Sequence, residues 1–194
     1  MSSLETMTIL DEVLAQLAAL MGEVRNDQLG DPTPCRDFDV ERLRHHILGW
    51  LTAFADGYAD PGGKARAGID DYEVPSDAAA AVREAAERMG AAVRAGAAQR
   101  PLWLGDNAMP GELALDMILW EYQMHGWDLA RALDRPWSPP AAAAEQSLQF
   151  APAMLTPDYQ GEGKPFAPAV PVPADAPPLD RLLGLSGRDP QWQP

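Results

Sequence analysis

Residues 111–133, GELALDMILWEYQMHGWDLARAL, are the stretch that decides the fold of this chain. They contain no proline and form the strongest helical segment of the sequence. Pro110, directly before them, can occupy the first turn of a helix because a proline there loses no hydrogen bond. We therefore predict a helix over this stretch, and its few polar residues become the candidates for chemistry.

Helices are also predicted on both sides of this stretch. Apolar residues at three- and four-residue spacing predict a first helix over about residues 5–24, and Asp39 can cap a second one that runs through ERLRHHILGWLTAFADGY. Ser76 is a suitable N-cap for a third, Ala-rich helix over residues 77–97. Beyond the central helix, a shorter one is expected around residues 141–155.

Prolines and glycines separate these helices and end the regular part of the chain. Residues 60–75 and 99–110 are expected as loops for this reason. Residues 156–194 hold too many prolines for regular structure, apart from one apolar turn, LDRLLGLSG. Strand-like alternation is nearly absent, so we predict an all-α protein. Residues 1–155 are expected to form an up-and-down four-helix bundle with an extra short helix, on which the Pro-rich C-terminal tail docks.

The charge of the chain limits its partners. The 194 residues suit one domain, and 29 acidic against 15 basic residues give a formal charge of -14. A surface of that sign repels phosphate backbones and anionic lipids. We therefore expect no nucleic acid and no membrane as partner, and a small molecule as substrate. A homodimer stays open, because small bundles often associate through spare apolar faces.

Cysteine usage and the N-terminus indicate a cytoplasmic protein. Cys35 is the single cysteine, so it cannot form an internal disulfide and cannot build a Cys-rich zinc site. The N-terminal residues lack the positive region of a secretory signal. No apolar run reaches the roughly 18 residues that a membrane span needs.

The central helix carries a pair of residues that could share a metal ion. Glu121 and His125 are four residues apart, so their side chains leave the same helix face. A third ligand would have to come from the second helix, where the apolar pattern leaves both His45 and His46 open. Two histidines and a glutamate are a normal zinc set that keeps a position free for a reactant. On spacing alone the plainer alternative is favoured: a hydrogen-bonded pair within one helix and solvated histidines.

Three segments of the chain resemble a known family. HGWDLARAL at 125–133, TPCRDFDVERLRHHILGW at 33–50 and GKPFAPAVPVPADAPPLDRLLGLSGRDP at 163–190 are similar to the mycothiol-dependent maleylpyruvate isomerase N-terminal domain group of the DinB-like superfamily. The resemblance implies a four-helix bundle with His46, Glu121 and His125 as metal ligands. It also implies a divalent metal, with zinc expected and nickel or iron compatible, and mycothiol as the thiol cosubstrate.

Several functions are compatible with such a site. The isomerase of this group carries a further C-terminal domain with a catalytic arginine, whereas only the Pro-rich tail follows the bundle here. We therefore expect a metal-dependent mycothiol S-transferase or isomerase-like enzyme that acts on another small electrophile. A hydrolase that uses metal-bound water and a non-catalytic scaffold whose metal only holds the bundle together remain alternatives.

Other residues near the candidate ligands have two interpretations each. Asp128 follows His125 by three positions and could orient its imidazole, or cap the helix. Arg131 could bind a carboxylate, but a favourable charge near the helix C-terminus is the commoner role. The large aromatic side chains of the two helices could line a pocket or fill the core: Trp50, Trp120 and Trp127.

Overall fold

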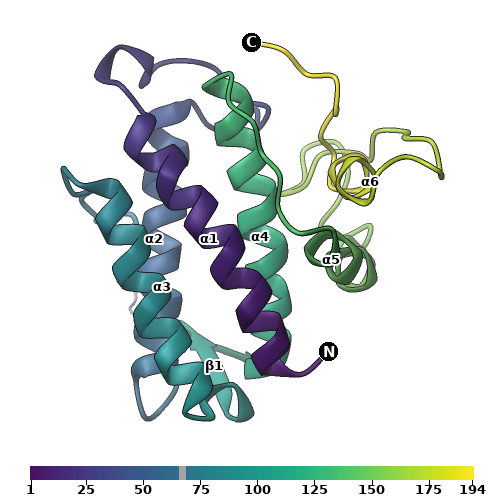
Figure 1. Ribbon diagram of the computed structural model, residues 1–194. Helices are drawn as coiled ribbons and strands as arrows, with labels where there is room; N and C mark the ends of the chain where they lie inside the picture. Colours follow the sequence, from purple (N-terminus) through teal and green to yellow (C-terminus); the bar gives the residue numbers. More distant parts are fainter. Residues whose placement is uncertain (66–68) are drawn as a thin grey trace.

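The computed structural model describes residues 1–65 and 69–194. Within this part of the chain, four long helices lie side by side and two shorter helices flank the last of them (Figure 1). The long helices are α1 (Ser3–Glu23), α2 (Val40–Ala59), α3 (Ala78–Arg94) and α4 (Gly111–Ala132); the shorter ones are α5 (Ala141–Met154) and α6 (Pro178–Leu185). Single 3-10 turns occur at Asn26–Gln28 (η1) and Ala97–Gln99 (η2). The chain is thus mostly helical, as predicted.

Side-chain caps explain where the long helices begin. The Ser2 hydroxyl and the Glu5 carboxylate form a capping box at the start of α1. The carboxylate of Asp39 accepts from the amide of the third residue of α2, at 2.8 Å, as predicted. For α3 the expected cap, Ser76, is wrong by one residue. The carboxylate of Asp77 accepts from the amide of Ala80 at 2.8 Å instead.

The order of helix directions differs from the predicted up-and-down bundle. α1 and α4 run parallel, because Ser3 contacts Glu112 near their starts and Glu23 contacts Arg135 just beyond their ends. α2 and α3 also run parallel. The first turns of α2 and residues 69–76, which lead into α3, line one hollow, and the salt bridge of Arg88 with Asp56 links the later parts of the two helices. The physical reason is that residues 69–76 lie beside the first turns of α2, so α3 begins at the same end of the bundle as α2.

A small β-hairpin closes the end of the molecule where α1 begins. β1 (Pro101–Leu104) pairs antiparallel with β2 (Asn107–Pro110), in a segment that was expected to be loop. Gly105, with φ of +62°, makes the tight turn between the strands, a conformation that glycine adopts without steric cost. Four-residue strands are too short to show a clear alternation in the sequence.

The apolar side chains form two clusters that meet at α4. The first fills the space between the four long helices. The second joins the other side of α4 to α5 and α6; its buried members include Trp120, Met124, Phe150, Leu182 and Leu183. The apolar turn expected in the C-terminal tail is therefore an eight-residue helix. α4 is covered on both sides along its second half, so Gln123, His125 and Asp128 are buried.

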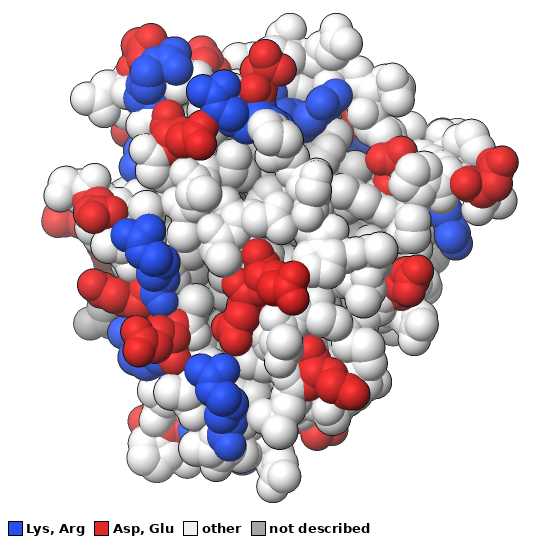
Figure 2. Space-filling view, viewed as in Figure 1, with Lys and Arg blue, Asp and Glu red and all other residues white. Residues whose placement is uncertain are grey.

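The surface carries charges of both signs. On the face shown in Figure 2, acidic and basic side chains are interspersed and no continuous basic patch forms. No helix in residues 1–65 and 69–194 combines the length and the apolar character that crossing a membrane requires.

Candidate metal centre

Two helices bring the three predicted ligands together. His46 projects from the second turn of α2, and Glu121 and His125 project from the middle of α4, one turn apart. The Nε2 atom of His46 lies 3.1 Å from Oε1 of Glu121, and Nε2 of His125 lies 3.1 Å from the same oxygen. One ligand atom from each residue lies within 4.8 Å of the others. The three side chains therefore form a candidate metal site.

The structure separates the two adjacent histidines of α2. The ring of His46 faces α4, with its centroid 4.8 Å from that of His125. The ring of His45 lies 6.2 Å from that of Tyr72, on a different side of the helix. Consecutive residues of a helix point about 100° apart, so only one of the pair can reach Glu121.

The geometry of this triad suits a zinc ion. In a tetrahedral site with bonds of about 2.0–2.1 Å, neighbouring ligand atoms lie about 3.3 Å apart. The two nitrogen–oxygen distances of 3.1 Å are close to that value. The donor set of two imidazoles and one carboxylate is normal for zinc and also accepts nickel or iron. Three protein ligands leave a further position free for a reactant.

Asp128 holds the far side of the His125 ring. Its Oδ2 atom lies 3.1 Å from Nδ1 of His125, and its side chain is completely buried. Because an ionised carboxylate only accepts, Nδ1 carries the hydrogen and Nε2 is directed at the site. The interpretation of Asp128 as an orienting residue is supported, and helix capping is not its role here.

Arg188 completes this arrangement and was missed from the sequence. Its guanidinium donates to both oxygens of Asp128, from Nη2 at 3.0 Å and from Nε at 3.4 Å. The residue lies just beyond α6, sixty positions after its partner. No spacing rule links residues that far apart, so the only signal was the end of the family-like segment GLSGRDP.

Burial and charge shift the pKa values of the site in opposite directions. Burial disfavours the imidazolium of His125, but Glu121 and Asp128 on its two sides outweigh this and raise its pKa to about 9. Burial would raise the pKa of Glu121, yet the two histidines hold it well below its usual range. Burial acts likewise on Asp128, and Arg188 and His125 keep its pKa below normal. The site is therefore built for carboxylates that stay charged beside a cation.

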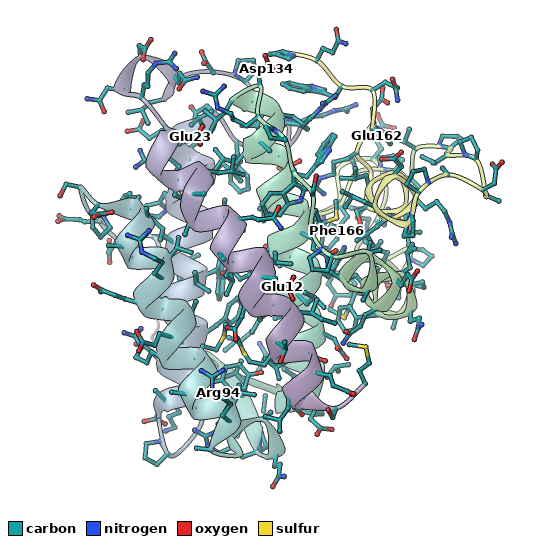
Figure 3. All side chains as sticks on the ribbon, in the orientation of Figure 1. Glu12, Glu23, Arg94, Asp134, Glu162 and Phe166 are labelled. Atoms are coloured by element: carbon teal, nitrogen blue, oxygen red, sulfur yellow. The ribbon has the colours of Figure 1, made fainter. Side chains whose placement is uncertain are left out.

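A cavity of about 750 Å³ opens onto the three ligands. Its walls are the loop of residues 34–38, the face of α4 that carries Trp120, and the C-terminal residues 161–171. Phe166 lies between α4 and the C-terminal helices (Figure 3), and its ring stacks on that of Trp120 at 5.2 Å. A bulky ligand could thus reach the metal position under a largely apolar roof.

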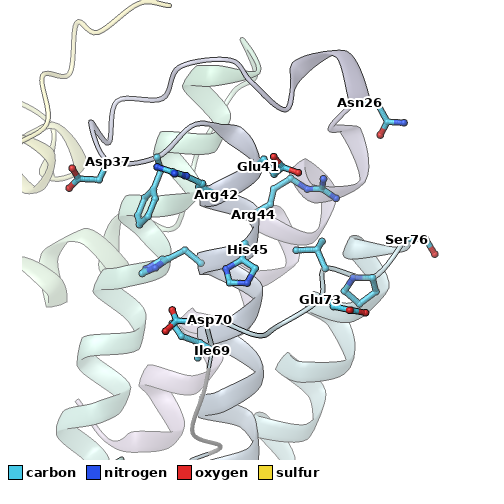
Figure 4. A pocket seen from close by; sticks show the side chains of 14 residues that line it. Asn26, Asp37, Glu41, Arg42, Arg44, His45, Ile69, Asp70, Glu73 and Ser76 are labelled. Atoms are coloured by element: carbon cyan, nitrogen blue, oxygen red, sulfur yellow. The ribbon is translucent and has the colours of Figure 1, made fainter.

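A second hollow, of about 930 Å³, lies on the other side of His46. It is bounded by the first turns of α2 and by residues 69–76, and Figure 4 shows His45 projecting from α2 toward the segment that carries Asp70. Asp37, Phe38 and His46 line both hollows, and the rings of Phe38 and His46 lie 4.8 Å apart. These three residues therefore lie between the two hollows.

Neighbouring residues have more ordinary roles. Trp120 is buried in the core and also lines the cavity, whereas Trp50 stacks on Phe54 within α2. Arg131 donates to the carbonyl of Trp192 at 3.1 Å, so it ties down the C-terminus and does not line the cavity. Cys35 lines the cavity, but burial raises the pKa of its thiol and keeps it protonated.

Gly126, directly after the candidate ligand His125, is required by close packing. A Cβ atom at this position would lie 2.3 Å from the ring of Trp137. The indole thus presses against the main chain of α4 beside the ligand. The glycine of the HGWD segment therefore has a steric explanation.

Comparison with known proteins assigns the chain to a family. Residues 10–130 match the family model described as the mycothiol maleylpyruvate isomerase N-terminal domain. Two uncharacterised proteins of Mycobacterium tuberculosis, from strains CDC 1551 / Oshkosh and ATCC 25618 / H37Rv, are each 34% identical over 178 residues, which is 88% of this chain and 91% of theirs. No solved structure matches the chain. The matched residues include all three candidate ligands. The chain therefore belongs to the mycothiol maleylpyruvate isomerase N-terminal domain family, within the DinB-like superfamily.

Proposed function

We propose that this protein is a metal-dependent enzyme that uses mycothiol as a cosubstrate and acts on a small electrophile, as an S-transferase or an isomerase-like enzyme. The observation that carries the proposal is a three-ligand site that opens onto a cavity of about 750 Å³. A structural zinc is normally closed by a fourth protein ligand, whereas a catalytic one keeps a free position. In this proposal the four long helices are the DinB-like bundle that holds the ligands, and the protein works in the cytoplasm.

Different residues of the chain bind the metal, orient a ligand and line the cavity in this mechanism. His46, Glu121 and His125 would hold the metal, and Asp128 keeps the ring of His125 turned toward it. Zinc, when bound, lowers the pKa of a thiol so that the thiolate is the reacting form at neutral pH. The stacked rings of Phe166 and Trp120 would give the electrophile an apolar wall.

The size of the cavity fits the proposed pair of reactants. Pockets for small molecules typically span about 300–1,000 Å³, and this cavity of about 750 Å³ lies within that range. Its volume agrees with the simultaneous binding of a thiol cosubstrate and a small electrophile.

Metal content and thiol binding test this function separately. Protein purified without a metal-affinity resin is expected to carry close to one zinc per chain by mass spectrometry, and the matched variant Glu121→Gln to carry much less. The zinc-loaded protein with mycothiol at 100 times its dissociation constant should gain about 2.7 kcal/mol of stability. Cysteine alone serves as the control thiol, since it lacks the rest of mycothiol.

Turnover of the S-transferase is measured as the loss of free mycothiol thiol in the presence of a haloalkyl electrophile, since only S-transfer consumes the thiol. The wild-type protein should accelerate this loss, and Glu121→Gln should not. Absence of metal from the wild-type protein would overturn the proposal altogether. Bound metal with no response to mycothiol would instead favour hydrolysis or a scaffold.

A further inference from the structure

The C-terminal segment contacts the residue that orients the candidate ligand His125. Arg188 follows α6, and its side chain is 10% exposed while that of its partner Asp128 is fully buried. The contact crosses sixty residues of sequence and joins the C-terminal segment to the C-terminal part of α4. A residue outside the four long helices therefore contacts the group that orients a ligand.

The guanidinium of Arg188 is held at three points. Nη2 and Nε donate to the two oxygens of Asp128, and Nη1 donates to the carbonyl of Ser186 at 3.0 Å. Two parallel donors from a rigid, planar group fix the plane of a carboxylate as well as its position. Oδ2 of Asp128, which accepts from Nη2, is also the atom that accepts from Nδ1 of His125. The arginine thus determines where that hydrogen bond can form.

The main chain at Arg188 is positioned independently of its side chain. Its amide donates to the carbonyl of Leu183 at 2.9 Å, and the amide of Gly187 donates to that of Gly184 at 3.1 Å. With φ of +80° at Gly187, this is the Schellman arrangement that ends a helix. The hydroxyl of Ser186 also accepts from the indole of Trp120 at 3.0 Å, which ties the end of α6 to α4.

The carboxylate of Asp128 depends on this arginine. Among the described residues, its hydrogen-bonding partners are His125 on one side and Arg188 on the other. Without the guanidinium, only the contact with His125 would hold the plane of this carboxylate. The acceptor for Nδ1 of His125 would then be free to turn.

We propose that Arg188 is a positioning residue of the metal centre, which acts through Asp128 to hold the imidazole of His125, so that the C-terminal segment is a working part of the site. The proposal rests on the metal site proposed above. It assigns to Arg188, which also lines the cavity, a role that needs no contact with the metal. Removing such an orienting partner typically lowers metal affinity about 10- to 100-fold.

Zinc affinity of the full-length protein, measured by competition with a fluorescent chelator, tests the proposal. Arg188→Gln is expected to lower the affinity about 10- to 100-fold. Arg131→Gln is the matched control, because it removes another arginine contact between α4 and the C-terminus and leaves Asp128 untouched. The control should stay within about twofold of the wild type, since it does not orient a ligand.

Two further measurements separate positioning from general loss of structure. The visible absorption of the cobalt-substituted protein, which reports ligand geometry, should change in Arg188→Gln and not in Arg131→Gln. In an Asp128→Asn background, Arg188→Gln should have little further effect on affinity, because both changes break the same chain of contacts. If Arg188→Gln does not fold, Arg188→Lys decides: it keeps the charge but loses the fork, and a clear loss of affinity is expected.

The outcomes that overturn the proposal are distinct from those that overturn the function. Equal zinc affinities for Arg188→Gln and Arg131→Gln would refute the role of Arg188 alone. An undiminished effect of Arg188→Gln in the Asp128→Asn background would refute the route through Asp128. A wild-type protein that binds zinc but not mycothiol would overturn the proposed function and leave this inference standing. A wild-type protein that binds no zinc would overturn both.

Discussion

Metal binding to this site should release a proton from His125, and its affinity should therefore depend steeply on pH. In the metal-free protein, Glu121 and Asp128 raise the pKa of His125 to about 9 against the burial that opposes them. The imidazole is then protonated at pH 7, whereas a metal ligand must be neutral. Each ion that binds must displace this proton.

The size and sign of the pH dependence of metal affinity follow from the pKa of His125. One displaced proton gives a tenfold gain in the association constant per pH unit, so affinity should rise about 100-fold from pH 6 to pH 8 on account of His125. The rise should level off near pH 9, where the metal-free ring loses its proton. Asp128→Asn removes one of the two carboxylates that raise the pKa, so the levelling should begin at lower pH.

Calorimetric titration of zinc at pH 7.5, repeated in buffers with different ionisation enthalpies, counts the protons released. At least about one proton per zinc is expected from His125, and fewer in Asp128→Asn at pH 8. Release well below one proton in the wild type, with an affinity that is flat between pH 7 and pH 8, would refute the reasoning. It would mean that the ring is already neutral before the metal binds.

The remaining predictions concern stability. Without metal, the raised pKa of His125 stabilises the fold fully below the unfolded pKa of about 6.5, and this contribution is lost as pH rises toward about 9, so the denaturation midpoint of chelator-treated protein should fall over that window. Gly126→Ala should cost about 1–3 kcal/mol in urea unfolding, because its Cβ would meet the ring of Trp137 at 2.3 Å. Gly30→Ala, with no atom within 4 Å of the added Cβ, is its control, and an equal cost at both sites would contradict the steric explanation. Asp77→Ala should cost about 1 kcal/mol through loss of the α3 cap and Ser76→Ala close to none; the reverse order would restore Ser76 as the cap.

Local sequence patterns predicted the long helices and two of the three candidate ligands, Glu121 and His125. Periodic apolar residues and capping side chains depend on neighbours within one turn, so α1, α2 and α4 lie close to their expected ranges. The same short-range geometry placed Glu121 and His125 on one face of α4. The β-hairpin was missed because its strands are only four residues long.

The sequence by itself thus determined that the chain is helical and that one helix carries a carboxylate and an imidazole one turn apart. Spacing left His45 and His46 open, and the family resemblance selected His46. The tertiary structure shows that His46 faces Glu121 and His125, because the rotation of α2 is set by the packing of its apolar side against α3 and α4. It also decided that α2 and α3 run parallel and that Arg188 reaches Asp128. A contact between residues sixty positions apart, such as that of Arg188 with Asp128, depends on how the helices pack against one another. The spacing of residues within one segment does not predict it.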